Sequence, residues 1–191
     1  FACAPRQPEP SDGPGLSTGV GAARRIAAAG PGSKYAPVLH AAFVRRKGEY
    51  GMRWPGAIYD GEAALKRYRE AIVAEAARLG MRLDLRSAPV HSAEEAGAWI
   101  GGAKAAKADG LLVVLLDRQD HAWPTAYQAA ASAIPAVVFA PLGAAFTTNT
   151  APLAGKTGVF VASTDDFRQA AYGMRMIRAG AKLREMRDLV I

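Results

Sequence analysis

The chain has 191 residues, which is enough for one well-cored domain but leaves too few for a second domain of ordinary size. Half of the residues are hydrophobic and 8% are aromatic, as is typical of a globular protein. The formal net charge is +7, but Lys and Arg are spread along the sequence without an aromatic-interleaved basic motif, so we expect no nucleic-acid partner. No apolar run approaches the roughly 18 residues that span a bilayer. The single cysteine, Cys3, excludes an internal disulfide framework and a Cys-rich zinc site.

The first part of the chain has the composition of a linker. Pro, Gly, Ser and Ala dominate residues 4–34, and such a stretch buries too little apolar surface to offset its ordering entropy. We therefore predict a disordered or tether-like segment over residues 1–36 and a folded α/β domain over residues 37–191. Two interpretations of Cys3 stay open: it carries the lipid of a bacterial lipoprotein, or the chain begins at a fragment boundary. The aliphatic residues 189–191 have the composition of a strand, so we expect the natural polypeptide to continue into a further domain.

The chain is organised around residues 109–117, the strongest strand candidate. Residues 111–116 are six consecutive branched aliphatics, which is typical of a strand buried on both faces in a parallel sheet covered by helices. Four other segments have the composition of strands: 38–44, 81–85, 136–140 and 158–162.

Local signals delimit four helices between and after these strands. Two of them begin at capping residues, Asp60 and Ser92, and the first ends at Gly80. The third, over residues 125–132, follows a proline suited to a first helical turn. The last begins at residues 163–166, and its apolar residues are expected to share one buried side: Phe167, Ala170, Ala171, Met174, Ile177 and Leu183.

The alternation of strands and helices predicts the fold class. Right-handed crossovers between parallel strands give an α/β fold with a doubly wound, mainly parallel open sheet of about five strands flanked by helices, Rossmann-like or flavodoxin-like. In open sheets of this kind, ligands bind outside the carboxyl ends of the strands. We therefore expect the functional site at that edge.

Polar loops follow the predicted strands at this edge. The loop after the central strand holds Asp117, Arg118 and His121, and a carboxylate near an imidazole could share a proton or hold a sugar hydroxyl. The loop after the first strand holds Arg53 and Trp54, which suit a carboxylate, a phosphate or a sugar ring. We predict no metal site in this chain, because the spacing places no third protein ligand beside the carboxylate and the imidazole.

A third loop, after the fourth strand, offers the neutral hydrogen-bonding groups of Thr148 and Asn149. Each of the three loops also has a structural interpretation. Asp117 could cap local backbone groups, Trp54 could form a rigid turn over the sheet, and the threonines could satisfy turn backbone.

From about residue 37 to residue 191, the order of motifs resembles the amino-terminal part of the L-fucose/L-arabinose isomerase-like superfamily. The residues that carry this resemblance are the loop 50–56, the strand 109–117, Ile134 and Pro135 before the fourth strand, and the pattern 163–167 leading to 174–179 and 183–185. The resemblance implies an aldose–ketose isomerase-like protein, a homo-oligomer that acts on a small sugar with a divalent metal such as Mn²⁺. In that family the metal ligands and catalytic carboxylates come largely from later domains, so no catalytic residue and no cofactor is assigned within this chain.

Two functions are therefore expected as alternatives. The first is a sugar-isomerase-like domain that binds a small sugar or polyol through a set of edge residues: Arg53, Trp54, Asp117, Arg118, His121, Thr148 and Asn149. The second is a noncatalytic, lipid-anchored binding module similar to one lobe of a periplasmic sugar receptor. The first implies a cytoplasmic protein, and the second a periplasmic or membrane-anchored one, attached only through Cys3. A protein-interaction domain without a small-molecule ligand is a third, weaker hypothesis.

Overall fold

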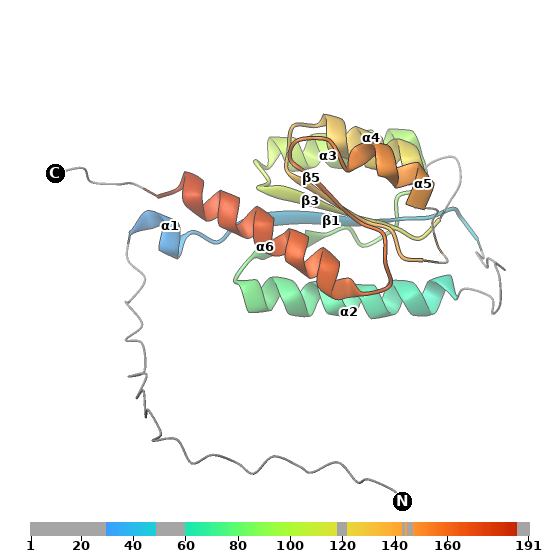
Figure 1. Ribbon diagram of the computed structural model, residues 1–191, viewed down its shortest axis with the longest axis horizontal. Coiled ribbons are helices and arrows are strands. Elements are labelled where there is room, and N and C mark those ends of the chain that lie inside the picture. Colours follow the sequence, from blue (N-terminus) through green and yellow to red (C-terminus); the bar gives the residue numbers. More distant parts are fainter. Residues whose placement is uncertain (1–29, 49–59, 118–121, 143, 145–146, 187–191) are drawn as a thin grey trace, which may run out of the picture.

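The computed structural model describes residues 30–48, 60–117, 122–142, 144 and 147–186 (Figure 1). Within them, five strands form one sheet in which all neighbours are parallel, in the order β2-β1-β3-β4-β5. The strands are β1 (Val38–Val44), β2 (Arg82–Leu85), β3 (Gly110–Leu115), β4 (Ala136–Phe139) and β5 (Val159–Ala162). The predicted α/β fold with a doubly wound, parallel sheet is confirmed.

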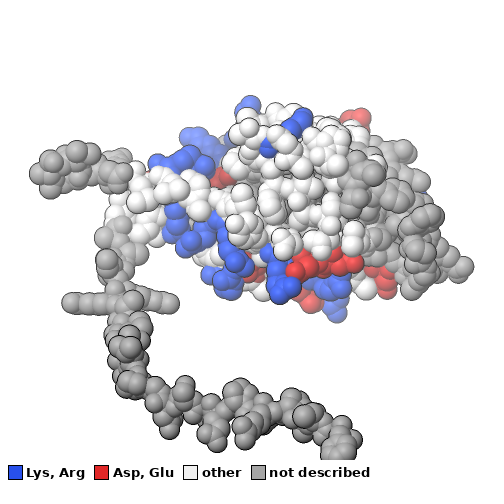
Figure 2. Space-filling view, viewed as in Figure 1, with Lys and Arg blue, Asp and Glu red and all other residues white. Residues whose placement is uncertain are grey.

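Helices cover both faces of this sheet. On one face α2 (Gly61–Leu79) lies beside α6 (Phe167–Arg184), whereas α3 (Ala93–Ala105) and α4 (Ala122–Ala131) pack together on the other (Figure 1). Three short elements were found besides these: α1 (Pro31–Lys34), α5 (Thr147–Thr150) and a 3-10 turn, η1 (Ala151–Leu153). Figure 2 shows the surface in the same view, with Lys and Arg side chains gathered around the C-terminal part of α6.

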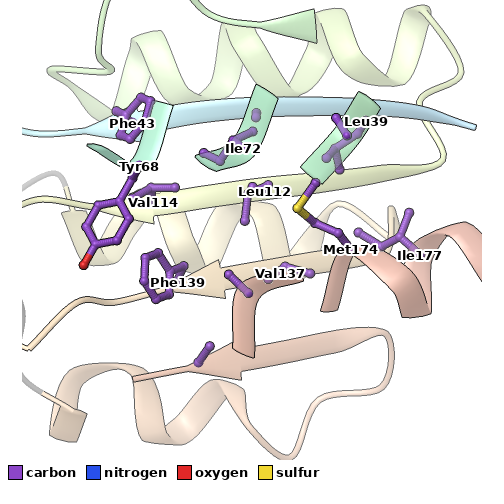
Figure 3. Packing of buried hydrophobic residues seen from close by; sticks show 14 of the residues in the cluster. Leu39, Phe43, Tyr68, Ile72, Leu112, Val114, Val137, Phe139, Met174 and Ile177 are labelled. Carbon is purple, nitrogen blue, oxygen red and sulfur yellow. The ribbon is translucent and has the colours of Figure 1, made fainter. Parts of the chain in front are cut away.

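The central strand β3 contributes to both hydrophobic cores because its side chains alternate between the two faces of the sheet. Leu112 packs in the core under α2 and α6, whereas Leu111 packs in the core under α3 and α4. All residues of β3 are buried. Figure 3 shows the first core, where the ring of Tyr68 from α2 meets Phe139 of β4 edge to face at a centroid distance of 4.9 Å.

The predicted helix boundaries at Asp60, Gly80 and Ser92 are confirmed by the contacts of these residues. The Asp60 carboxylate accepts a hydrogen bond from the Ala63 N–H at 2.9 Å, and the Ser92 hydroxyl accepts one from the Glu95 N–H at 3.2 Å. Gly80 ends α2 with φ = 63°, a left-handed conformation that favours glycine. Local sequence signals are therefore sufficient to set these ends.

The prediction that Leu183 shares the buried side of the last helix is wrong. Its side chain is 65% exposed, whereas Ile177 is buried in the core. The six residues between them correspond to about 600° of helical rotation, so Leu183 is turned about 120° away from Ile177. A helix that keeps a 3.6-residue period therefore carries Leu183 to its outer face.

Three local details differ from the sequence-based expectations. α4 begins at Ala122 rather than at residue 125, because Pro124 is compatible with any position of the first turn, where its missing N–H is not needed. The loop expected between β4 and β5 contains α5 and η1. Residues 31–34, expected in the linker, form α1 and pack against α6, where a side chain on Gly32 would lie 2.6 Å from the Lys182 carbonyl oxygen.

Several expectations concern parts of the chain outside the described residues. These are the tether over residues 1–29, the lipid on Cys3 and the strand suggested for residues 189–191. None of the helices in the described ranges is both long enough and apolar enough to cross a membrane.

Candidate functional site

The strand order places a topological switch point between β1 and β3. β1 continues through α2 to β2 on one side, and β3 continues through α4 to β4 on the other, so the two connections diverge at the carboxyl ends of the central pair. This divergence is the usual position of ligand sites in open parallel sheets. The residues that follow the two strands, Arg45 to Gly48 after β1 and Asp117 after β3, are therefore the described part of the expected site.

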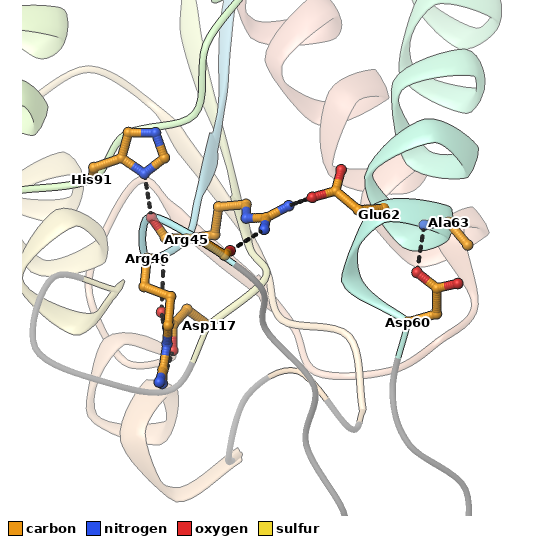
Figure 4. Close-up of polar contacts among 8 residues, drawn as sticks. Arg45, Arg46, Asp60, Glu62, Ala63, His91 and Asp117 are labelled. Carbon is orange, nitrogen blue, oxygen red and sulfur yellow. Dashed lines mark hydrogen bonds and ion pairs between the residues drawn. The ribbon is translucent and has the colours of Figure 1, made fainter.

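Asp117 is held at this point by Arg46. The Asp117 side chain is 0% exposed, and its Oδ2 accepts hydrogen bonds from the Arg46 N–H at 2.8 Å and from its Nε at 3.0 Å. The other carboxylate oxygen accepts from Nη2 of the same guanidinium at 3.0 Å (Figure 4). A two-pronged contact of this kind fixes the plane and the direction of the guanidinium. Asp117 thus positions Arg46.

Arg45 points to the opposite side of β1. Its side chain is only 8% exposed, and the guanidinium forms an ion pair with Glu62 of α2 and donates to the Gly48 carbonyl at 2.8 Å (Figure 4). The Arg45 carbonyl lies 2.8 Å from Nδ1 of His91. Because a carbonyl can only accept, Nδ1 carries the hydrogen, and Nε2 is the acceptor of the neutral ring.

A groove of about 380 Å³ opens next to these contacts, on the β2 side of β1. It is lined by residues that follow β1, by the first half of α2 and by residues that follow β2: Arg45, Arg46, Lys47, Gly48, Glu62, Leu65, Arg69, Ser87, Pro89 and His91. Four of these side chains are cationic and one is a carboxylate. The groove therefore offers charge and donors to an anionic group, together with a carboxylate and an imidazole that can accept from hydroxyls.

Arg69 forms the α2 wall of this groove. Its Nη2 donates to the Ser87 carbonyl at 2.9 Å, and its guanidinium lies 5.7 Å from the centroid of the Phe43 ring, which is buried at the end of β1. These two contacts restrain the direction of the guanidinium at the groove. The cationic wall is thus preorganised in part by backbone and aromatic partners.

Of the seven predicted site residues, the structure describes Asp117, Asn149 and the backbone of Thr148. Asp117 lies at the switch point, and Asn149 lies in α5, which packs beside α4. Thr148 also belongs to α5, although its side chain lies outside the described atoms. The other four predicted residues lie outside the described residues: Arg53, Trp54, Arg118 and His121.

Sequence analysis missed the contribution of α2 and of the segment after β2. Glu62 and Arg69 were not considered because helical charges ordinarily face solvent, and no motif marks them. One signal was available: Arg69 directly follows Tyr68, a core residue, and lies in the first half of α2, the half that follows the carboxyl edge of β1. In the described part of the chain, no group of three or more His, Cys, Asp or Glu side chains is arranged to hold a metal ion.

Comparison of the chain with protein-family models, with curated proteins and with solved structures finds no match. The flavodoxin-like strand order alone does not define a function, because many unrelated activities share this architecture. The groove and its contacts are therefore the basis on which a function can be inferred.

Proposed function

We propose that this chain is a ligand-binding α/β domain that takes a small sugar or polyol bearing a carboxylate or phosphate group at the carboxyl edge of its sheet. The observation that carries the proposal is the pair of oriented arginines at the end of β1. Asp117, which follows β3, holds the Arg46 guanidinium, and Glu62 of α2 holds that of Arg45, and both arginines are among the residues that line the groove.

The contacts around the groove support an anionic rather than a neutral ligand. Arg45, Arg46, Lys47 and Arg69 bring four positive charges, against the carboxylates of Glu62 in the wall and Asp117 behind it. Guanidinium groups suit carboxylate and phosphate because they can donate two parallel hydrogen bonds. The hydroxyls of the same ligand would meet Glu62 and the acceptor nitrogen of His91.

For the whole polypeptide, we propose the activity that the sequence motifs suggest, aldose–ketose isomerisation. In this proposal the domain forms the substrate-covering wall of a site, and a later domain supplies the divalent metal and the catalytic carboxylates. A noncatalytic, sugar-receptor-like module is the alternative, and the same groove would serve it. Turnover of a bound sugar with Mn²⁺ by the full-length natural protein would separate the two.

Binding is tested by isothermal titration of the chain with pentoses, deoxyhexoses and polyols, each compared with its phosphate and its sugar acid. We expect at least one anionic member to bind. Arg69→Gln should weaken that binding about tenfold, since a charge-assisted hydrogen bond contributes roughly 1.5–3 kcal/mol. Lys66→Gln is the matched control, because it removes the same charge from an exposed position of the same helix that does not line the groove.

Two outcomes would contradict the proposal. Uniform absence of binding heat from a folded sample would remove the ligand altogether. Equal binding of neutral sugars and their phosphates, insensitive to Arg69→Gln, would place any sugar site elsewhere.

A further inference from the structure

The His91 ring has one nitrogen engaged and the other open to solvent. Nδ1 donates to the Arg45 carbonyl oxygen at 2.8 Å, and Nε2 has no hydrogen-bond partner in the part of the chain that the structure describes (Figure 4). In that part, Nε of Arg86 is the only buried side-chain nitrogen or oxygen without a partner, so Nε2 of His91 reaches solvent. Because His91 lines the groove, Nε2 is the atom at which the ring can take up a proton or contact a ligand.

Backbone contacts on both sides of His91 hold the ring at the groove. The Val90 N–H donates to the Phe43 carbonyl at 2.7 Å, and the Val90 carbonyl accepts from the Arg45 N–H at 3.1 Å. The His91 N–H donates to Oε2 of Glu95 at 3.2 Å. These contacts and the Nδ1 hydrogen bond are compatible with both the neutral and the cationic ring, since Nδ1 carries a hydrogen in each. A proton can therefore be added at Nε2 without breaking any of them.

The charged side chains around His91 come from four parts of the fold. They are Arg45, Arg46 and Lys47 after β1, Glu62 and Arg69 on α2, Arg86 after β2 and Glu95 on α3. Three of the arginines are paired with carboxylates: Arg45 with Glu62, Arg46 with Asp117 and Arg86 with Glu95. Lys47 and Arg69 have no carboxylate partner among the described residues. Two positive charges of the groove are thus left for an anionic ligand.

An anion in the groove distinguishes the two forms of the His91 ring. In the neutral ring Nε2 is an acceptor, and its lone pair opposes a carboxylate or phosphate oxygen. In the cationic ring Nε2 is a donor on a positive charge, which gives a charge-assisted hydrogen bond to the same oxygen. Imidazole is the side chain that ordinarily changes its charge between about pH 5 and 8, whereas Arg, Lys and Glu keep theirs.

We propose that binding of an anion in this groove is coupled to protonation of Nε2 of His91, so that the site binds its ligand more tightly in mildly acidic solution. The inference rests on the proposed function, because it takes the ligand to carry a carboxylate or phosphate group. The coupling is reciprocal: the factor by which the proton raises the affinity for the anion equals the factor by which the anion raises the affinity for the proton. A neutral sugar gains little from the proton, because a hydroxyl can donate to the neutral ring or accept from the cationic one.

The coupling is measured directly by NMR titration of the imidazoles with pH, in sodium sulfate and in sodium chloride of equal ionic strength. Sulfate is the probe because it stays a dianion throughout the titration. The midpoint for His91, assigned with His91→Asn, should be higher in sulfate by about 0.5 pH unit or more. His40, which lies in β1 beside Asp84 and does not line the groove, is the internal control.

Two variants locate the anion in this experiment. Arg69→Gln, which removes a cation from the groove, should reduce the shift of the His91 midpoint in sulfate. Lys66→Gln removes the same charge from an exposed position of α2 outside the groove and should leave the shift unchanged. A His91 midpoint that is equal in the two salts would overturn the inference.

Isothermal titration with gluconate tests the coupling on a sugar acid whose own charge does not change. Its dissociation constant should fall about tenfold between about pH 8 and pH 5.5 in the wild type. His91→Asn keeps a donor for the Arg45 carbonyl but cannot take up a proton, so its dissociation constant should change less than about twofold over that interval. Gluconate binding with the same pH dependence in both proteins would contradict the coupling and leave the proposed function intact. A sulfate-dependent shift of His91 in a chain that binds none of the sugars would support the coupling and contradict the proposed function.

Discussion

Two aspartates flank the central strand β3, and their partners differ in kind. Asp109, at the amino end, accepts from the Tyr35 hydroxyl at 2.9 Å, the Val38 N–H at 2.8 Å and the Arg184 guanidinium at 2.7 Å. Asp117, at the carboxyl end, accepts three hydrogen bonds from Arg46, one from its backbone N–H and two from its guanidinium. Asp109 thus joins three segments of the chain, whereas Asp117 orients the guanidinium of Arg46.

The difference shows how the two edges of the sheet divide their roles. Around Asp109, the segment before β1, the start of β1 and the last turn of α6 are tied together, and none of these contacts belongs to the groove. Around Asp117, the described partner, Arg46, is among the residues that line the groove. The amino edge therefore holds the fold together, and the carboxyl edge prepares a binding surface, as expected for an open parallel sheet.

The largest effect is expected from Asp117→Asn. The amide would turn an NH₂ group toward one of the Arg46 donors and leave a cation without its buried counter-charge. We expect the free energy of unfolding to fall by about 3 kcal/mol, the typical loss when one partner of a buried pair is removed. Urea unfolding measures this loss, and titration of a bound ligand should show weaker binding in the same variant. A free energy of unfolding close to that of the wild type would show that Asp117 does not clamp the two strand ends.

A smaller effect is expected from Asp109→Asn, with no effect at the groove. The Asn oxygen can still accept from the Tyr35 hydroxyl or the Val38 N–H, and Arg184, whose side chain is 53% exposed, can turn to water. We expect the free energy of unfolding to fall by about 1–2 kcal/mol. Ligand affinity should equal that of the wild type when measured by titration. A ligand affinity reduced as strongly as in Asp117→Asn would erase the distinction between the two edges.

The same two aspartates show what the sequence can and cannot predict. The hydrophobic run of β3, its burial on both faces and the polar character of its carboxyl end follow from the residues themselves. The Arg46 partner of Asp117 does not, because the two residues are 71 positions apart in the sequence. β1 and β3 pair with Val44 opposite Leu115, and this register brings the residues two positions further on, Arg46 and Asp117, side by side. The strand order and register are therefore needed to show that Asp117 is hydrogen-bonded to Arg46.

The groove was missed for a related reason. Sequence analysis placed the site on the loops after β1, β3 and β4, because polar residues cluster there. The described groove instead combines the end of β1 with α2 and the segment after β2. Glu62 and Arg69 become wall residues through the way α2 packs on the sheet, which the helical pattern of α2 does not specify.

The exposure of Leu183, by contrast, could have been predicted from the helical period alone. Counting its angular position from Ile177 places it on the outer face of α6.

The smallest change in the free energy of unfolding is expected from Tyr35→Phe, and this change should depend on pH. The hydrogen bond from Tyr35 to Asp109, with burial as a weaker cause, raises the pKa of Tyr35 above its ordinary value of 10.0. A folded-state pKa above the unfolded one means that the bond stabilises the protein fully below about pH 10 and that this contribution is lost as the pH rises through the folded-state pKa. Tyr35→Phe should therefore lower the free energy of unfolding by about 1 kcal/mol at neutral pH. The difference from the wild type should shrink when urea unfolding is repeated above pH 10. A difference that stays constant, or grows, in alkaline solution would mean that the Tyr35 hydroxyl does not act by donating to Asp109, and the amino edge would then depend on the Val38 and Arg184 contacts alone.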